Sequence, residues 1–301
     1  MRSERLSCVD HPRLTAGTKR IAAWSAALAV TMVIAAPATA QQCVAHWPLD
    51  GTPEELVNGD PGALVGGGVS FDPGGIGGFA EFDGASYVDA GANPALTDFA
   101  DTQITISAWI RQRPDAINIP GNDPDSAFIS ARTNCNIGNW QAYNRLGSSL
   151  YFSKWWRDPA DEFDSPEAQL FGPPIPDNVW RHVAISVSNN TASFYVDGVF
   201  QSDASDLNTP FTIKNAVQSV QLGWDSCGSY FTGDLDDVAV YSSALDANQV
   251  LGIYDDGVAG KAQCRLDPVT KADCQNGGWE DFGFKNQGQC IRFVNTGKDS
   301  R

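Results

Sequence analysis

The sequence predicts an all-β sandwich, a fold of two packed antiparallel sheets, between residues 43 and 257. Short runs of β-branched and aromatic residues recur there, separated by clusters of Gly, Pro, Asn and Asp that are typical of turns. Several runs alternate apolar and polar residues with a period of two, so we expect each strand to have one buried and one more exposed face. At most one helix interrupts this pattern.

The predicted strands cover residues 44–49, 79–82, 87–89, 104–111, 127–131, 141–144, 150–152, 180–187, 192–196, 218–222 and 235–241. The alternation is clearest in two of them: the isoleucines of residues 104–110 share one phase, and so do the valines and isoleucine of residues 183–187. Residues 113–126 and 155–178 lack this pattern and are rich in Pro and Asp. Loops of this length are either mobile or functional.

The single predicted helix follows the last strand. Asp246 is a suitable N-cap for a helix over residues 247–254. Val250, Leu251 and Tyr254 have the spacing of one helical face, so we expect this helix to pack over an edge or an end of the sandwich.

The last predicted strand carries a carboxylate in an unusual place. Asp236 has the same alternation phase as Val238 and Val240, so it faces the core if those valines do. A buried carboxylate needs backbone amides, an arginine or a metal ion as its partner.

Residues 1–40 have the pattern of a secretory signal peptide. Lys19 and Arg20 precede sixteen mainly apolar residues, and Ala38-Thr39-Ala40 provides a cleavage site. We therefore predict a soluble protein that is exported to the outside of the cell or to the periplasm after cleavage near Ala40. No later segment is long enough to span a membrane.

Removal of those residues takes away five basic and two acidic side chains, so the formal net charge changes from −16 to −19. Nucleic acids and anionic membranes bind clustered Lys and Arg, which this chain lacks, so neither is an expected partner. Neutral ligands and divalent cations suit such a surface.

Six cysteines remain after the signal, and an even number in an exported chain indicates disulfides. Six cysteines can form three disulfides in fifteen different pairing schemes. We predict that Cys43 pairs with Cys264, Cys135 with Cys227 and Cys274 with Cys290. The last pair closes a loop in a polar tail, residues 261–301, which is too short to build a large core. A metal site formed by these cysteines is not expected, because no C-x-x-C pair is present.

Six short motifs occur in an order that resembles the laminin-G-like branch of the concanavalin A-like lectin/glucanase family. They are AHWPLD at 45–50, FDGASYV at 82–88, ISAW at 106–109, WRHVA at 180–184, FYVDG at 194–198 and GDLDDV at 233–238. The resemblance covers residues 44–257. It implies a jelly roll with one concave sheet, in a family whose members mostly bind glycans or proteins and seldom catalyse. The signal and the tail are similar to those of secreted bacterial proteins.

The same resemblance implies a structural calcium ion between the first and last strands. Its ligands would be Asp50, Asn58, Asp60 and Asp236, with backbone carbonyls completing six to eight oxygens. The segment Gly51-Thr-Pro-Glu-Glu departs from the Gly/Ser-rich loop of many relatives, which bears on Asn58. The alternative is that Asp236 only accepts backbone hydrogen bonds.

Carbohydrate binding requires flat apolar rings with polar groups around them. The candidate residues are Arg132, Asn139, Trp140, Tyr143, Trp155, Trp156, Trp224, Asp225 and Tyr230. They converge on one rim of the sandwich if Cys135 pairs with Cys227. Trp47, Trp109 and Trp180 match core positions of the family and are therefore left out.

A polysaccharide-cleaving enzyme of the same fold is one alternative. Such enzymes need paired carboxylates on a strand, and Glu162, Asp164 and Glu167 supply only the spacing, because Pro166 interrupts a run without apolar alternation. The two histidines of the mature chain, His46 and His182, lie within strands, and no serine elbow is present. We predict a non-catalytic binding module, for carbohydrate or adhesion first and for protein partners at the cell envelope second.

Overall fold

The computed structural model describes residues 43–74, 77–92, 96, 103–114, 125–134, 137–145, 149–155, 167–206, 219–261, 264, 268, 271–272, 274–275, 279, 284–296 and 298. Only the backbone is described for residues 133, 137, 138, 155 and 167. The predicted signal peptide and its cleavage site lie outside these residues.

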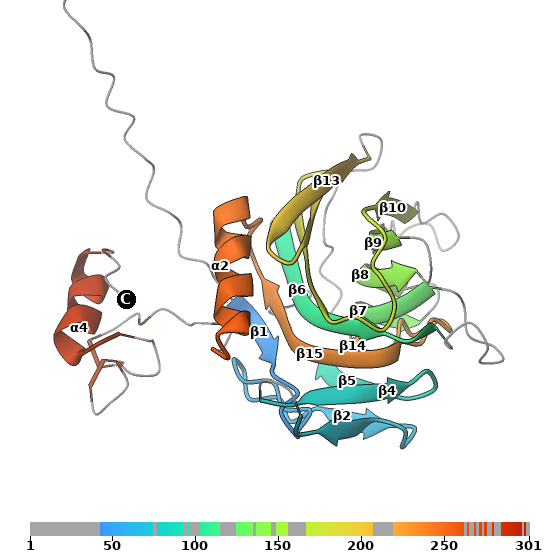
Figure 1. Ribbon diagram of the computed structural model, residues 1–301, viewed down its shortest axis with the longest axis horizontal. Coiled ribbons are helices and arrows are strands. Elements are labelled where there is room, and N and C mark those ends of the chain that lie inside the picture. The colour runs from blue at the N-terminus through green and yellow to red at the C-terminus, as the bar shows by residue number, and fades with distance from the viewer. Residues whose placement is uncertain are drawn as a thin grey trace, which may run out of the picture. The chain divides into compact units, whose positions relative to one another are not determined.

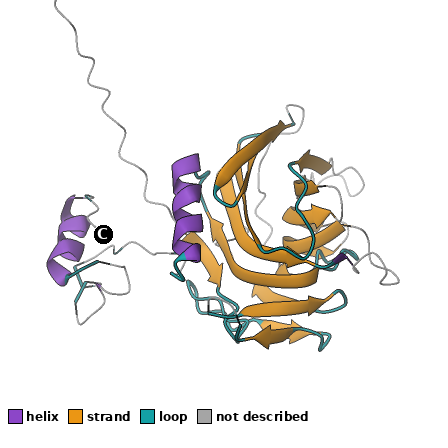
Figure 2. Cartoon of the chain, in the orientation of Figure 1, coloured by secondary structure: helices purple, strands orange, loops and turns teal. Residues whose placement is uncertain are grey.

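The fold is a sandwich of two antiparallel sheets, which confirms the predicted class (Figures 1 and 2). The larger sheet has the order β13-β12-β11-β6-β15-β4-β3, with β1 also paired to β15. Its strands are β1 Cys43–Trp47, β3 Ser70–Asp72, β4 Phe79–Asp83, β6 Gln103–Gln112, β11 Arg181–Ser188, β12 Thr191–Val196, β13 Val199–Ser205 and β15 Thr232–Tyr241.

The smaller sheet has the order β10-β9-β8-β7-β14-β5-β2. Its strands are β2 Ala63–Val65, β5 Tyr87–Ala92, β7 Asp125–Asn134, β8 Ile137–Arg145, β9 Ser149–Trp155, β10 Glu167–Phe171 and β14 Ser219–Leu222. The two sheets share one apolar core. Phe82, Ile106 and Phe194 of the larger sheet and Phe128 and Phe152 of the smaller one are fully buried within it.

Four strands were not predicted, and each stands at an end of the strand order of its sheet: β13, β3, β10 and β2. Strand β10 lies inside the segment 155–178, for which no strand was expected. An edge strand bonds to one neighbour only and is commonly short or charged. Three of these strands expose most of their described side chains, so their apolar alternation is weak.

Helix α2, Ala247–Val258, starts as predicted but is longer. Asp246 caps it and forms a capping box with Gln249. The helix contacts the edge strand β13, and it also extends over the outer face of the larger sheet, where Val250 and Ile253 pack in a cluster with residues of β11, β12 and β15. Strands β11 and β15 are therefore buried on both faces, which corrects the expectation of one exposed face per strand.

Two of the three predicted disulfides are confirmed. Cys43–Cys264 joins the start of β1 to the segment after α2, across a sequence separation of 221. Cys274–Cys290 joins a residue before helix α4, Gln287–Thr296, to a residue in the first turn of that helix. Phe284 packs against this bond. Cys227 is also disulfide-bonded, while Cys135 lies outside the described residues. Disulfides favour an oxidising, extracellular compartment.

Within the described part of the chain, no helix has both the length and the apolar character needed to cross a membrane.

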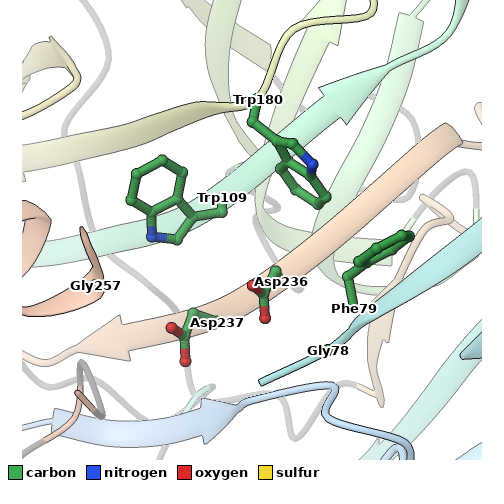
Figure 3. Close-up of a pocket in the computed structure, with 7 residues that line it drawn as sticks. All are labelled: Gly78, Phe79, Trp109, Trp180, Asp236, Asp237 and Gly257. Atoms are coloured by element: carbon green, nitrogen blue, oxygen red, sulfur yellow. The ribbon is translucent and has the colours of Figure 1, made fainter. Parts of the chain in front are cut away.

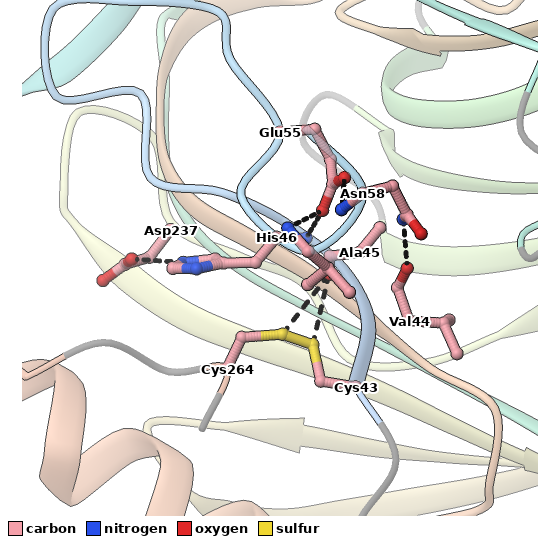
Figure 4. The surroundings of a disulfide bond; sticks show 9 residues. Cys43, Val44, Ala45, His46, Glu55, Asn58, Asp237 and Cys264 are labelled. Atoms are coloured by element: carbon pink, nitrogen blue, oxygen red, sulfur yellow. Dashed lines mark hydrogen bonds and ion pairs between the residues drawn. A yellow bond between two sulfur atoms is a disulfide. The ribbon is translucent and has the colours of Figure 1, made fainter. Parts of the chain in front are cut away.

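The loop after β1 is held by a buried glutamate that the sequence did not indicate (Figure 4). The Glu55 carboxylate is fully buried and accepts hydrogen bonds from the backbone N–H groups of His46 at 2.8 Å, Val57 at 2.7 Å and Asn58 at 2.6 Å. Asn58 Nδ2 donates to the carbonyl oxygen of Val44 at 2.9 Å. The loop is thus fastened to β1 from two sides.

We predict that Glu55→Gln destabilises the fold. The amide places a donor against one of three backbone N–H groups, and a hydrogen bond to a charged group contributes roughly 1.5–3 kcal/mol. The free energy of unfolding in urea should therefore fall by about 2 kcal/mol or more. The neighbouring Glu54 is exposed, so Glu54→Gln makes the same charge change with an effect within about 0.5 kcal/mol. Equal effects of the two substitutions would contradict this role of Glu55.

Candidate functional site

The candidate site is built around a bulge in strand β15. Asp236 pairs with Trp109 of β6, but the next pair is Ala239 with Ser107, so β15 contains one residue more than its neighbour. Asp237 occupies this position with φ of 48°, in the left-handed region that Asp tolerates better than most residues. The extra residue changes the alternation phase, so Leu235 and Val238 both face the core.

The alternation phase that Asp236 shares with Val238 and Val240 predicted that Asp236 faces the core. The structure shows that it does not. The bulge places it on the outer face of the larger sheet, half-buried and opposite Trp109. The prediction failed because it assumed an unbroken strand. A carboxylate pair at a strand's start is compatible with a bulge, but the period-two pattern alone does not reveal one.

Two other segments meet at this bulge. Residues 232–235 of β15 pair with β4, and residues 238–241 pair with β1, so the bulge lies where the partner of β15 changes. The Asp237 N–H donates to the carbonyl oxygen of Pro48 at 3.3 Å, just after β1. Asp50 lies against Gly78, where a Cβ atom would be 3.2 Å from the Asp50 Cα. The backbones approach this closely because position 78 carries no side chain.

Two of the carboxylates here, Asp236 and Asp50, have raised pKa values. Burial, followed by the nearby Asp237 and Asp50, raises the pKa of Asp236 to about 8. Burial and Asp237 also raise the pKa of Asp50, and His46 opposes this effect. His46 Nε2 lies 2.8 Å from Asp237 Oδ1 (Figure 4). Within the described residues, Asp236 has no such basic partner.

A pocket of about 220 Å³ opens beside these carboxylates on the outer face of the larger sheet. Figure 3 shows three aromatic rings around the position of Asp236. The lining residues come from β4, β6, β15, α2 and the segment before β11, and they are Gly78, Phe79, Trp109, Trp180, Asp236, Asp237 and Gly257.

Trp109 and Trp180 are half-buried and line this pocket, so their assignment to the core, made from the family resemblance, was wrong. Trp47 is buried in the core as expected. A signal for Trp109 was present in the sequence: Ile106, Ala108 and Ile110 face the core, so the alternation of β6 places Trp109 on the other face.

The predicted carbohydrate ligands on the other sheet fall into two groups. The first is a buried network around Asp225. Its Oδ1 accepts from the backbone N–H groups of Cys227 at 2.7 Å and Ser229 at 2.9 Å, and its Oδ2 lies 3.2 Å from the Tyr143 hydroxyl and 3.3 Å from Arg132 Nη1. Asp225, Tyr143 and Arg132 are each at most 4% exposed. These three residues converge as predicted, but they bond to one another instead of facing solvent.

The second group is an aromatic platform of Tyr87, Trp224 and Tyr230, all half-buried. The Trp224 and Tyr230 rings stack at 5.5 Å with 14° between their planes, and the Tyr87 ring lies 4.4 Å from Trp224. The buried Asp225 directly follows Trp224 and holds this turn. Tyr87 was not predicted, although its neighbour Val88 faces the core and the alternation of β5 therefore places Tyr87 outside.

The remaining candidate ligands do not join the platform. Trp140 is fully buried in the core, and its Nε1 donates to the carbonyl oxygen of Leu96 at 3.0 Å, so it offers no surface to a ligand. Asn139, beside it on β8, is 4% exposed. Trp155 ends β9, with its side chain outside the description, and Trp156 lies outside the described residues.

The four predicted calcium ligands are only partly brought together. The carboxylates of Asp50 and Asp236 influence each other at the bulge. The Asn58 side chain bonds instead to Val44, and the Asp60 carbonyl oxygen accepts from the Glu55 N–H at 2.8 Å. In the part of the chain that is described, no three acidic, His or Cys side chains form a metal cluster.

The residues considered for catalysis are either buried or only partly covered by the described residues. Glu162 and Asp164 lie outside the described residues, and Glu167 starts the edge strand β10. Ser107 Oγ lies 2.8 Å from His182 Nε2, a distance that suits a nucleophile and its base, but both residues are fully buried. Burial lowers the pKa of His182 to about 3. A substrate has no access to this pair.

The chain belongs to the concanavalin A-like lectin/glucanases superfamily, because a family model of that description matches residues 82–251. The family predicted from the ordered motifs is thus confirmed. No curated protein matches the sequence.

Solved structures share the fold at low sequence identity. Domain 4 of AbnA, an extracellular arabinanase from Geobacillus stearothermophilus solved with arabinotriose, is 20% identical, with a TM-score of 0.52 over 70% of this chain and 98% of that one. The binding domain of Paraclostridial Mosquitocidal Protein 1 is 16% identical, with a TM-score of 0.52 over 72% of this chain. This chain covers 52% of that toxin domain. At these identities the likeness concerns the fold alone.

We predict that Asp236→Asn stabilises the metal-free protein at pH 8 to 9. The carboxyl has an unfolded pKa of 3.8 and a raised folded pKa of about 8. Its contribution is favourable below pH 4 and is lost as the pH rises towards 8, at about 1.4 kcal/mol per pKa unit. Urea unfolding in EDTA should show a gain of more than about 1 kcal/mol at pH 8.5 and little change at pH 4. The exposed Asp255→Asn serves as control, and a gain that is independent of pH would contradict this assignment.

Proposed function

We propose that this protein is a secreted, non-catalytic carbohydrate-binding module, with a glycan or cell-surface polysaccharide as its partner. The observation that carries this proposal is the platform of Tyr87, Trp224 and Tyr230. Partly exposed stacked rings give sugar rings an apolar face to pack on, and the tyrosine hydroxyls bond to sugar hydroxyls. Burial raises the pKa of both Tyr87 and Tyr230, so these hydroxyls keep their protons at neutral pH. In AbnA, a domain of this fold was solved with arabinotriose.

We propose that the chain has three parts: a signal peptide at 1–40, the sandwich at 43–257 and a disulfide-closed tail at 261–301. Secretion is supported by the disulfides Cys43–Cys264 and Cys274–Cys290. A non-catalytic role is supported by the engagement of the buried polar groups. Asp225 and Glu55 bond to backbone N–H groups, and the Ser107–His182 pair has no access to solvent.

Adhesion through a protein partner is a second candidate. Val199 and Phe200 of the edge strand β13 are 58% and 47% exposed, and Leu251 of α2 is 42% exposed. Gly198 lies against Leu251, so these side chains belong to one region of the outer face. Exposed apolar groups at a sheet edge are a common feature of protein interaction sites.

The structural calcium ion also remains a proposal. Asp50 and Asp236 are the two predicted ligands that share a site, and their mutual repulsion is what a divalent cation relieves. Backbone carbonyls of the converging segments would complete the oxygen ligands. The ion would join β15 to the end of β1, two segments that are far apart in sequence.

We predict that Trp224→Ala weakens glycan binding at least tenfold, a loss of about 1.4 kcal/mol. A glycan array, run with and without calcium, first identifies the bound sugar, and calorimetry then measures the affinity. Phe200→Ala removes an exposed ring from the other sheet and should leave the affinity unchanged. Circular dichroism confirms that both variants are folded. Absence of binding to any glycan in both conditions would refute the carbohydrate proposal and favour a protein partner.

We predict that calcium raises the melting temperature of the purified protein and that EDTA reverses the increase. A ligand that binds only the folded state contributes about 2.7 kcal/mol at a concentration one hundred times its Kd. Asp50→Asn should abolish the increase, whereas Asp255→Asn should not. An unchanged melting temperature, with no calcium found by elemental analysis, would count decisively against the ion.

A further inference from the structure

The pocket in Figure 3 differs from the Trp224 platform in size and in charge. It is concave and measures about 220 Å³, below the roughly 300–1,000 Å³ of pockets that enclose drug-sized ligands. It therefore suits a small head group. Its acidic lining residues are Asp236 and Asp237, and its walls are the rings of Phe79, Trp109 and Trp180.

Aromatic walls above carboxylates are the chemistry that recognises an organic cation. A cation over the face of a Trp or Phe ring is attracted by the electron-rich face of the ring. A carboxylate supplies the opposite charge. Trp109 lies directly across the strands from Asp236, so one side chain of each kind is fixed at adjacent positions of the sheet.

The protein already places a cation of its own on two of these rings. The Arg111 guanidinium carbon lies 5.2 Å from the centre of the Phe79 ring and 5.0 Å from that of Trp180. Arg111 is neutralised by Asp234, with Nε 2.6 Å from Oδ2. This internal pair shows that the ring edges and faces here accommodate a cation beside a carboxylate. The Asp236 carboxylate next to it has no equivalent partner among the described residues.

We propose that this pocket binds an organic ammonium group, with Trp109 and Trp180 as its aromatic walls and Asp236 as its counter-charge. The bulge supplies the carboxylate, β6 the main aromatic wall and α2 the closing wall at Gly257. The ammonium can belong to a quaternary head group or to an amino sugar. The proposal goes beyond glycan binding at Trp224 and does not depend on it.

The test is calorimetric titration of the purified protein, in EDTA at pH 9, with two pairs of probes. Choline is compared with 3,3-dimethyl-1-butanol, its neutral isostere, and N,N,N-trimethylglucosamine oligomers, which stay cationic at pH 9, are compared with N-acetylglucosamine oligomers. We expect choline to bind at least tenfold more tightly than the isostere, because only choline pairs with Asp236. If trimethylglucosamine oligomers bind and choline does not, the source is an amino sugar and the ammonium proposal holds. Equal affinities within both pairs would overturn it.

Variants assign the binding to this pocket. Asp236→Asn should weaken the binding of the cationic probe about tenfold and leave that of its neutral counterpart unchanged, while Asp255→Asn should change neither. Trp109→Leu keeps an apolar side chain without a ring and should also lose the cation, whereas Trp109→Phe should retain it. If Trp109→Leu does not fold, the Asp236→Asn comparison is sufficient. An undiminished affinity in Asp236→Asn would overturn the proposal.

A titration with calcium distinguishes an ammonium site from a metal site, because both ligands would use the Asp236 carboxylate. The titration is therefore repeated with calcium, which should compete with the ammonium probe. If calcium binds in an Asp236-dependent manner and no ammonium probe binds in EDTA, the carboxylates belong to a metal ion only and the proposal is wrong.

Discussion

One extra residue in strand β15 determines where the charged groups of this protein lie. The strand must keep Leu235, Val238 and Val240 in the core while its partner changes from β4 to β1. A regular strand cannot place both Leu235 and Val238 on the same face. The residue at Asp237, in a left-handed conformation, resolves this conflict and turns two carboxylates to the outer face. Three segments that are distant in sequence then meet at one point.

Buried carboxylates elsewhere in the fold follow a different rule from those at the bulge. Glu55 is surrounded by backbone N–H groups of the loop after β1, and Asp225 by those of the turn before Tyr230. Both therefore stabilise a turn without needing an ion. Asp236 instead lies near other carboxylates, and burial together with these neighbours raises its pKa. The contrast separates acidic residues that shape loops from those that are available to a cation.

Much of the fold was predictable because it depends on local alternation and ordered motifs. Apolar residues of β6 and β11 pair in register, as Ile106 does with Ile185 and Ile104 with Val187. Asp246 caps α2, as its sequence context indicates. Edge strands such as β13 were missed because most of their side chains are exposed, so their sequences show little apolar alternation.

The candidate sites were less predictable for two physical reasons. A bulge changes the phase of a strand without a change in composition, which concealed the true face of Asp236. The alternation of β6 indicated that Trp109 lies outside the core, but only tertiary packing forms the pocket that it lines and buries Trp140 in the core. Arg132, Tyr143 and Asp225 lie close together, but they are buried and bond to one another instead of contacting solvent.

The bond between Cys43 and Cys264 has a mechanical consequence. It joins the first strand of the sandwich to the segment just after helix α2, so the 220 intervening positions form a covalently closed loop. Tension applied between the segments that precede Cys43 and follow Cys264 passes through this bond and does not pull on the strand hydrogen bonds. The sandwich would therefore stay folded when these two segments are pulled apart, for as long as the disulfide remains oxidised.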